Sequence, residues 1–331
     1  MNKRRIIFRA DGNSEIGLGH IIRSLALADM LKKNFECEFA TRFLTDFVKV
    51  EINKSCTKIY HLPESEQEHY DYFLEKIKGD EIVVLDNYFF STNYQNKIKE
   101  KGCKLVCIDD MHDKHYVADL VINHSPGLSK KEFLCKSSTK LCLGLDYVLL
   151  RSPFLEQAKK KSQIKEINTA FVCFGGSDSL NLTCKVVKFL IRFIWVEEIN
   201  VLIGDAYNYK NELDELIRDS QIINLYQNLD SFGVIQLMQK SNFAVVPAST
   251  LLFETLAAKL PAITGYYVDN QKQFEKDISE INNVESVGDF VKMKYITFAN
   301  RVNSLKKNYT FEIDCIDGRS GERLLNIFES L

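Results

Sequence analysis

Short apolar runs alternate with amphipathic segments along this chain, and this alternation restricts its fold more than any other feature. In the first half, five runs rich in β-branched residues alternate with segments of helical periodicity such as 21–33 and 94–101. The five runs are RRIIFR, CEFATR, EIVVLD, KLVCID and DLVIN. Repeated strand–helix–strand units form a parallel sheet with helical crossovers. We therefore predict an α/β fold.

The same pattern restarts after a hydrophilic stretch that is dense in lysine, EQAKKKSQIKEIN at 156–168, which we predict to be a linker. The later runs are TAFVCF, EINVLI, QIINLY, FAVV and PAITGYY. These boundaries predict two Rossmann-like domains, at 1–155 and 169–290, and a C-terminal extension at 291–331 that ends in a helix. Ligands of open α/β sheets bind at the carboxyl ends of the strands, so we expect two parallel sheets that face a central cleft.

Composition excludes several classes of partner. The chain has 331 residues, of which 45% are hydrophobic and 27% charged, which is ordinary for a globular protein. A net charge of −2, with dispersed basic residues, gives no attraction to polyanions, so we expect no nucleic-acid partner. No apolar stretch is long enough for a signal peptide or a membrane span, which predicts a cytoplasmic protein. Its nine cysteines contain no C-x-x-C pair and are expected to be reduced and structural. A monomer is the expected state.

The first loop that could carry chemistry reads RADGNSEIGLGHIIR. Gly17 and Gly19 permit a tight turn, and a helix begins at or near His20. Positive potential at a helix N-terminus favours a neutral imidazole, which can act as a general base. His20 and Asp11, at the end of the first strand, are therefore the catalytic candidates. An arbitrary G-x-G-H is more often only a capped turn, and it lacks the third glycine of a dinucleotide motif, so we expect no nicotinamide or flavin cofactor.

Two loops of the second half suit phosphate. In FVCFGGSDSLNLT, Gly175 and Gly176 permit close approach of a ligand to the backbone and Ser177 adds a donor, although glycine there can also serve turn geometry alone. In PASTLLFETL, Ser249 and Thr250 precede or begin a helix whose N–H groups can hold phosphate oxygens. Glu254, one turn later, is predicted either to accept two ribose hydroxyls or to face solvent.

Polar residues end three further strands of the first half. They are Asp86, Asn87 and Tyr88 after EIVVL, Asp109 and Asp110 after KLVCI, and Asn123 and His124 after DLVI. Tyr88, Asp110 and Asn123 are predicted to contact substrate. With two histidines that follow, His112 and His115, the two aspartates offer ligands for a divalent metal, but such a cluster is more commonly a polar loop with one or two substrate contacts.

Three segments, in this order and separation, resemble the PseG family of UDP-sugar hydrolases of pseudaminic acid biosynthesis. They are FRADGNSEIGLGHIIRSLALA, FVCFGGSDSLNLT and PASTLLFETLAAKLPAITGYYVDNQ. Weaker similarity in LDNYFF, IDDMH and LGLDYVLLRSPF extends the resemblance over roughly residues 4–275. The family has the GT-B fold and is similar in fold to the MurG glycosyltransferase.

The resemblance implies an activity and a set of site residues. It implies hydrolysis of UDP-2,4-diacetamido-2,4,6-trideoxy-β-L-altropyranose at C1 with inversion, giving free sugar and UDP, with neither metal nor cofactor. It implies that His20 is the base. The implied substrate contacts are Gly175, Gly176 and Ser177 near the nucleotide, Thr250 near the phosphates, Glu254 on the ribose, and Asn270 and Gln271 on the sugar or phosphate. Gly17, Gly19 and Ser249 complete the predicted binding set.

Three other functions remain open from the sequence. A glycosyltransferase of the MurG type would share the fold and the UDP-sugar site but use an acceptor hydroxyl in place of water. A UDP-sugar 2-epimerase would give an isomeric sugar. A non-catalytic nucleotide-sugar-binding protein is disfavoured by His20 and Asp11, because a binding protein needs no base at that place. In every case the expected ligand is a UDP-sugar.

Overall fold

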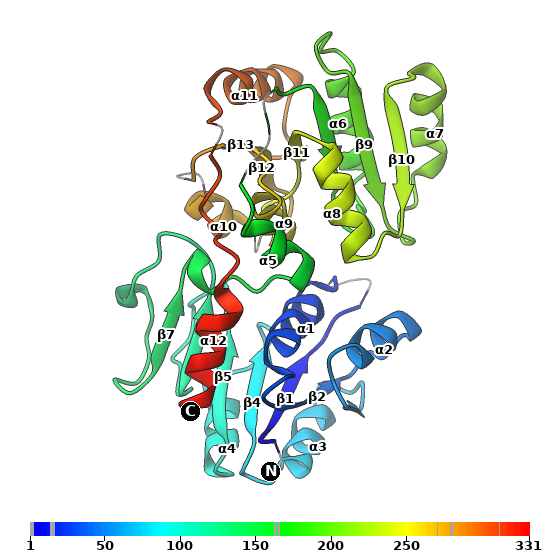
Figure 1. The fold of residues 1–331 in the computed structure, drawn as a ribbon. Coiled ribbons are helices and arrows are strands. Elements are labelled where there is room, and N and C mark those ends of the chain that lie inside the picture. The colour runs from blue at the N-terminus through cyan, green and yellow to red at the C-terminus, as the bar shows by residue number, and fades with distance from the viewer. Residues whose placement is uncertain are drawn as a thin grey trace. The chain divides into compact units, whose positions relative to one another are not determined.

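The computed structural model describes residues 3–13, 17–161, 164, 166–269, 271–278, 281–310 and 312–331 (Figure 1). It divides into two compact units. The first unit consists of Met1–Ser152 together with Arg319–Leu331, and the second unit of Pro153–Gly318. The chain therefore leaves the first unit once and returns to it for its last residues.

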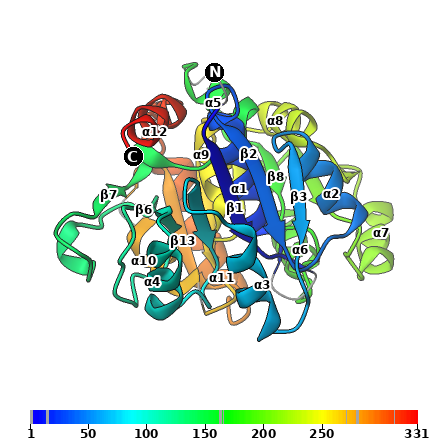
Figure 2. The same cartoon turned by 90° about the horizontal axis from the view of Figure 1, so that it is seen from below.

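Over its described residues, the first unit contains a seven-stranded sheet of order β3-β2-β1-β4-β5-β6-β7, in which every pair is parallel. The strands are β1 (Arg5–Ala10), β2 (Glu36–Thr41), β3 (Lys58–His61), β4 (Ile82–Asp86), β5 (Lys104–Ile108), β6 (Leu120–Asn123) and β7 (Lys140–Leu143). The helices are α1 (Gly19–Leu31), α2 (Asp46–Asn53), α3 (Glu68–Lys76), α4 (Thr92–Glu100) and α12 (Ser320–Glu329), with 3-10 turns at Lys130–Glu132 and Leu145–Tyr147. In the view of Figure 2, β1, β2 and β3 lie side by side.

Alternate residues of the buried strands build two cores, one on each face of this sheet. Ile6 and Phe8 of β1 pack in one core with α1, α2 and α12. Ile7 packs in the other core, with residues of α3 and α4. Helix α12 belongs to the first unit because Leu324 and Phe328 are buried in the first of these cores, where Phe328 meets the ring of Phe35.

The second unit contains a six-stranded parallel sheet of order β10-β9-β8-β11-β12-β13, counted over the residues that the structure describes. Its strands are β8 (Thr169–Val172), β9 (Glu198–Ile203), β10 (Ile223–Gln227), β11 (Phe243–Val245), β12 (Ala262–Tyr266) and β13 (Val284–Asp289). Its helices are α5 (Ser152–Ala158), α6 (Leu182–Leu190), α7 (Lys210–Asp219), α8 (Ser231–Lys240), α9 (Thr250–Ala257), α10 (Gln271–Ile278) and α11 (Tyr295–Asn308). One large core joins the sheet to α6, α7 and α11.

The two parallel sheets predicted from the alternation are confirmed. The domain boundaries fall at other residues than the sequence suggested. The expected linker, 156–168, contains the end of α5 and belongs to the second unit, and the expected extension, 291–331, is divided between α11 in the second unit and α12 in the first. Within the described part of the chain, no helix combines the length and apolar character needed to cross a membrane.

Candidate functional site

Each sheet has a point where the strand order reverses, and the predicted loops lie there. In the first unit the order reverses between β1 and β4, and in the second between β8 and β11. The loop after β1 leads to His20, and the loop after β4 begins at Asn87. The glycine loop at 175–176 follows β8, and Ser249 follows β11. Ligands of open α/β sheets bind at such switch points, because adjacent loops diverge there and leave the strand ends accessible.

In the first unit, the imidazole of His20 is paired with the carboxylate of Asp86. Nδ1 of His20 lies 2.7 Å from Oδ1 of Asp86. Nη2 of Arg23 also lies 3.1 Å from this nitrogen, but it donates to Oδ1 of Asp86 at 2.5 Å. Since a carboxylate can only accept and makes the shorter contact, we assign the proton to Nδ1, which donates to Asp86. In the neutral ring, Nε2 is then the unprotonated nitrogen. This is the tautomer that a general base requires, and Asp86 fixes it.

Arg23, one turn further along α1, joins Asp86 to Asp110. Its Nε donates to Oδ2 of Asp86 at 2.7 Å, and its Nη1 donates to both oxygens of Asp110 at 2.5 and 2.6 Å. The hydroxyl of Tyr88 also donates to Asp110, at 3.2 Å, and the ring of Tyr88 meets that of His20 edge-on at 4.7 Å between centroids. The structure therefore brings His20, Tyr88 and Asp110, all predicted from the sequence, into one cluster.

The charges of this cluster do not cancel. Burial acts to raise the pKa of Asp86, but Arg23 and His20 outweigh it and the pKa is lowered. Burial also acts to raise the pKa of Asp110, yet Arg23 holds that pKa well below its ordinary value. Two ionised carboxylates therefore face one guanidinium, which leaves one negative charge beside His20. That charge stabilises the ring once it has taken up a proton.

Asp11, the other catalytic candidate, is held by two arginines. Its carboxylate accepts from Nη1 and Nη2 of Arg9 at 2.6 and 2.9 Å, and from N and Nε of Arg42 at 2.8 and 2.7 Å. Burial acts to raise the pKa of Asp11, and the two arginines lower it below its ordinary value. Its backbone N–H donates to Oδ1 of Asn87 at 2.7 Å, which ties the end of β1 to the loop after β4. The carboxylate of Asp11 thus orients Arg9 and Arg42, whereas the carboxylate bonded to His20 is that of Asp86.

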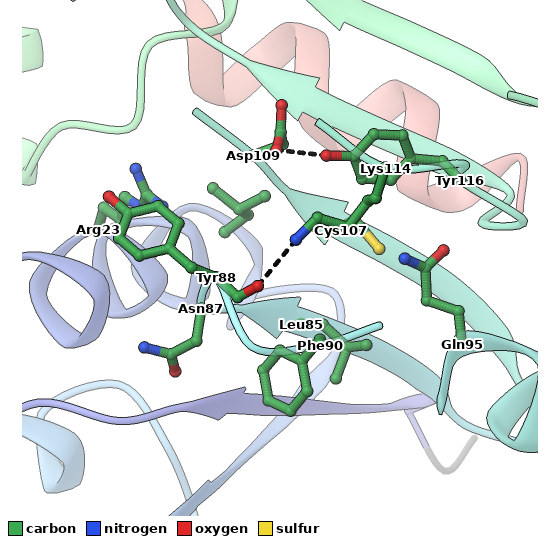
Figure 3. Close-up of a pocket in the computed structure, with 11 residues that line it drawn as sticks. Arg23, Leu85, Asn87, Tyr88, Phe90, Gln95, Cys107, Asp109, Lys114 and Tyr116 are labelled. Carbon is green, nitrogen blue, oxygen red and sulfur yellow. Dashed lines mark hydrogen bonds between the residues drawn. The ribbon is translucent and has the colours of Figure 1, made fainter. Parts of the chain in front are cut away.

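A small pocket adjoins the His20 cluster (Figure 3). It is little larger than one water molecule, with a cavity volume of about 10 Å³, and Arg23 and Tyr88 line it together with Asp109, Lys114 and Tyr116. Nζ of Lys114 donates to the carbonyl of Tyr88 at 2.9 Å. The pocket lies at the carboxyl ends of β4 and β5.

The side chain of Asp109 accepts hydrogen bonds that hold the loop after β5, one of them from Asn123. Nδ2 of Asn123 donates to Oδ2 of Asp109 at 3.2 Å, and the hydroxyl of Tyr116 donates to the other oxygen. Asn123 is buried, so its described contacts are internal. Asp109 and Asp110 are both engaged in these networks, and among the described residues no three acidic, histidine or cysteine side chains are arranged to hold a metal.

The turn before His20 depends on a glycine that the sequence patterns did not single out. A side chain at Gly12 would place its Cβ 2.8 Å from the carbonyl oxygen of Gly17. Gly17 has φ +77°, and a Cβ added there or at Gly19 would meet no described atom within 4 Å. A side chain at Gly12 would therefore clash with the backbone at Gly17, whereas no atom of the described residues crowds Gly17 or Gly19.

In the second unit, the glycine loop is exposed and its helix is already capped. Gly175 has φ +85°, and Gly175 and Gly176 are both exposed, with Ser177 half-buried. Asp178 accepts from the backbone N–H groups of residues 182 and 183 at 2.9 and 2.8 Å, at the start of α6. Burial raises the pKa of Asp178. A diphosphate at this loop would therefore meet the N–H groups of 175–177 and not those of the helix.

The neighbouring strand ends carry the other predicted residues of the second unit. Ser249 caps α9 by accepting from the N–H of residue 251 at 3.3 Å, and Thr250 is the first residue of that helix. Glu254 is only 4% exposed, so it is not a solvent-facing glutamate. Gln271 begins α10, and its Oε1 accepts from the N–H of Tyr267 at 3.1 Å. Asn270 lies outside the described residues.

Comparison with known proteins gives sequence relatives and structural neighbours. No family model matches the chain. An uncharacterized protein of Methanocaldococcus jannaschii is 27% identical over 99% of this chain, which spans 66% of that protein, slightly less than two thirds of its length. The UDP-2,4-diacetamido-2,4,6-trideoxy-β-L-altropyranose hydrolase of Campylobacter jejuni is 28% identical over 81% of this chain and 93% of its own.

The structural comparison establishes the fold. The crystal structure of Acinetobacter baumannii MurG matches with a TM-score of 0.66 at 11% identity, covering 99% of this chain and 100% of that one. With two parallel-sheet units, the chain therefore has the GT-B fold predicted from its sequence. The central cleft stays a prediction.

Proposed function

We propose that the chain is a UDP-sugar hydrolase of the PseG family, and that it hydrolyses a UDP-linked diacetamido-trideoxy sugar at C1 to give UDP and the free sugar. The relationship to the Campylobacter jejuni hydrolase supports the reaction class. The observation that carries the proposal is the pairing of His20 with Asp86, because a base held in one tautomer by a buried carboxylate is what activation of water needs.

In this mechanism, Nε2 of His20 removes a proton from water as the water oxygen attacks C1. The bond from C1 to the diphosphate oxygen breaks, UDP leaves with that electron pair, and the configuration at C1 inverts. Asp86 stabilises the protonated ring through the bond at Nδ1, and the extra negative charge shared with Asp110 adds to this. The ring then returns its proton to solvent.

The binding residues have separate tasks in this proposal. Tyr88 and Asp110, with Asn123 behind them, hold the sugar on the first unit, where Gly17 and Gly19 let it approach the backbone at the start of α1. On the second unit, the N–H groups at 175–177 and the hydroxyls of Ser249 and Thr250 meet the charge of the diphosphate, and the proposal assigns no metal to that task. Glu254 accepts the ribose hydroxyls, and Asn270 and Gln271 contact sugar or phosphate.

The test measures UDP release from the nucleotide sugar alone, with the product followed by NMR. Replacing His20 with alanine should lower kcat by about 10²–10⁴ and leave KM nearly unchanged, because the base acts only in the transition state. His115→Ala, a histidine of the same unit outside the cluster, is the matched control and should keep the wild-type rate. The first sugar anomer detected should be the inverted one.

Three results would refute the proposal in different ways. Hydrolysis by His20→Ala at the wild-type rate would remove His20 from the mechanism. UDP release that begins only when an acceptor alcohol is added would identify a glycosyltransferase, and an isomeric sugar still linked to UDP would identify an epimerase.

A further inference from the structure

Two arginines share one carboxylate at the carboxyl ends of β1 and β2. Arg9, from β1, is 0% exposed, and the side chain of Arg42, directly after β2, is 9% exposed. Both donate to Asp11, which is itself 0% exposed, through four N–H···O contacts of 2.6 to 2.9 Å. The mechanism proposed above uses none of these three side chains.

No other described contact supplies the missing negative charge. Nη2 of Arg9 lies 3.1 Å from Nδ1 of His69, and since a guanidinium only donates, that nitrogen carries the lone pair of an uncharged ring. Burial, together with both arginines, lowers the pKa of His69 to about 4. The ring of Phe89 lies 5.8 Å from the guanidinium of Arg9 and 5.1 Å from that of Arg42. Two positive charges therefore face one negative charge in aromatic surroundings.

Donors of both arginines also lack acceptors. Nε of Arg9 is buried and has no hydrogen-bond partner among the described residues. Arg42 uses its backbone N–H and Nε on Asp11, and the described part of the chain offers no hydrogen bond to its Nη atoms. Buried donors in proteins are almost always paired with protein or ordered water, so the buried Nε of Arg9 requires an acceptor from outside the described residues. The Nε of Arg42 is fixed by its hydrogen bond to Asp11. The two Nη groups of the guanidinium lie side by side, which is the geometry that binds two oxygens of one anion.

We propose that Arg42, oriented by Asp11 and backed by Arg9, is an anion-binding group that takes a phosphate on the first unit, apart from the His20–Asp86 pair. A phosphate matches both the unbalanced positive charge and the two-pronged donor. It comes either from free inorganic phosphate or from the diphosphate of a nucleotide, and the second source rests on the function proposed above. The backbone link from Asp11 to Asn87 places this site beside the loop that carries Tyr88.

The test follows Arg42 directly in the full chain. In ¹⁵N-labelled protein, the Nε–Hε signal of Arg42, assigned by its loss in Arg42→Lys, is recorded during titrations with inorganic phosphate, UDP and uridine. We expect saturable movement with phosphate or UDP and none with uridine. Movement with both ligands identifies a general phosphate site, and movement with UDP alone identifies the nucleotide as the source.

Calorimetry with variants supplies the second measurement. Arg42→Gln should weaken binding of the ligand that moves the Arg42 signal at least tenfold. Lys58→Gln removes one positive charge from an exposed lysine at the other end of the neighbouring strand β3, and it should bind as wild type does. The proposal is overturned if Arg42→Gln folds and binds unchanged. If that variant does not fold, an Arg42 signal that stays still in wild-type protein in all three titrations overturns it.

Failure here is distinguishable from failure of the hydrolase proposal, because the same preparation is assayed for UDP release. Hydrolysis with no response at Arg42 refutes only the phosphate site. A response of Arg42 to inorganic phosphate with no hydrolysis refutes only the enzymatic function.

Discussion

Asp86 is the residue on which the proposed chemistry most depends, and replacing it with asparagine isolates its charge. Asp86 is fully buried and accepts from Nδ1 of His20 at 2.7 Å, from Arg23 at 2.5 and 2.7 Å, and from the hydroxyl of Ser24 at 3.1 Å. Asparagine keeps the size of the side chain and one acceptor oxygen. It removes the negative charge that stabilises His20 once the ring is protonated.

The size of the effect can be bounded from this geometry. A hydrogen bond to a charged group contributes about 1.5–3 kcal/mol. The attraction between an imidazolium and a carboxylate about 4 Å apart is about 4 kcal/mol at an effective dielectric constant of about 20, and this includes part of the hydrogen bond. Since each tenfold change in rate corresponds to about 1.4 kcal/mol, Asp86→Asn should lower kcat by about 10² and by no more than about 10³.

The assay is UDP release across a range of pH, because Asp86 acts through His20 and does not touch the reacting atoms. Without the carboxylate, the protonated ring that forms in the transition state is less stable, so kcat should fall at every pH while KM stays nearly unchanged. Ser24→Ala removes one neutral donor to Asp86 and leaves the charge, so it should change kcat less than about threefold.

Loss of the fold would also lower the rate, because breaking a buried ion pair costs about 3–5 kcal/mol when one partner is removed. The thermal unfolding of Asp86→Asn is therefore measured alongside its kinetics. A folded Asp86→Asn that keeps the wild-type rate and pH profile would refute the role assigned to the His20–Asp86 pair.

Two further predictions concern the glycine loop and the pH dependence of stability. A methyl at Gly204 would place Cβ 2.5 Å from the carbonyl oxygen of Gly176, so Gly204→Ala should cost about 1–3 kcal/mol in urea unfolding and weaken UDP binding by calorimetry. Gly233→Ala, whose nearest contacts are side-chain atoms of Leu229 and Asp230 at 3.1–3.4 Å, should leave UDP binding unchanged. Equal UDP affinity in Gly204→Ala would contradict this. Folding lowers the pKa of His69 from 6.5 to about 4. As pH falls between these values, the unfolded chain takes up a proton that the folded chain does not, so the free energy of unfolding decreases, by at most roughly 3 kcal/mol. His69→Asn, which can still accept from Arg9, should therefore lose less unfolding free energy over that pH range. An unchanged dependence of stability on pH would contradict the role assigned to His69.

The fold was largely predictable because most strands are buried on both faces. Strands such as β4 and β8 are continuous apolar runs bounded by polar residues, which is the pattern of a central parallel strand. The strands that the pattern did not reveal are β3, β7 and β13, and all three lie at sheet edges. An edge strand is covered less completely, and β3, with the sequence KIYH, has no fully buried residue. Its sequence therefore lacks the apolar run that marks a central strand.

The last helix shows a second limit of local patterns. Its amphipathic sequence predicts a helix, and α12 is there. Which unit it packs against depends on where a complementary apolar surface remains uncovered, and in this protein that surface includes Phe35 and α1. Periodicity identifies the buried face of a helix and says nothing about its partner, so the return of the chain to the first unit does not follow from this pattern.

The pairing of His20 with Asp86 was missed for a reason that lies in strand order. Asp86 was visible only as a polar residue at the end of a strand, and His20 only as a histidine at the start of a helix, 66 residues apart in sequence. They meet because β4 pairs with β1, so the end of β4 lies beside the loop that enters α1. In a sheet that grows outward from its first strand in both directions, the strand that begins the second direction always lies next to the first. When a catalytic residue follows the first strand, the search for its partner should therefore begin at the end of the strand that starts the second direction, here β4. This holds even though β2 and β3 lie between β1 and β4 in sequence.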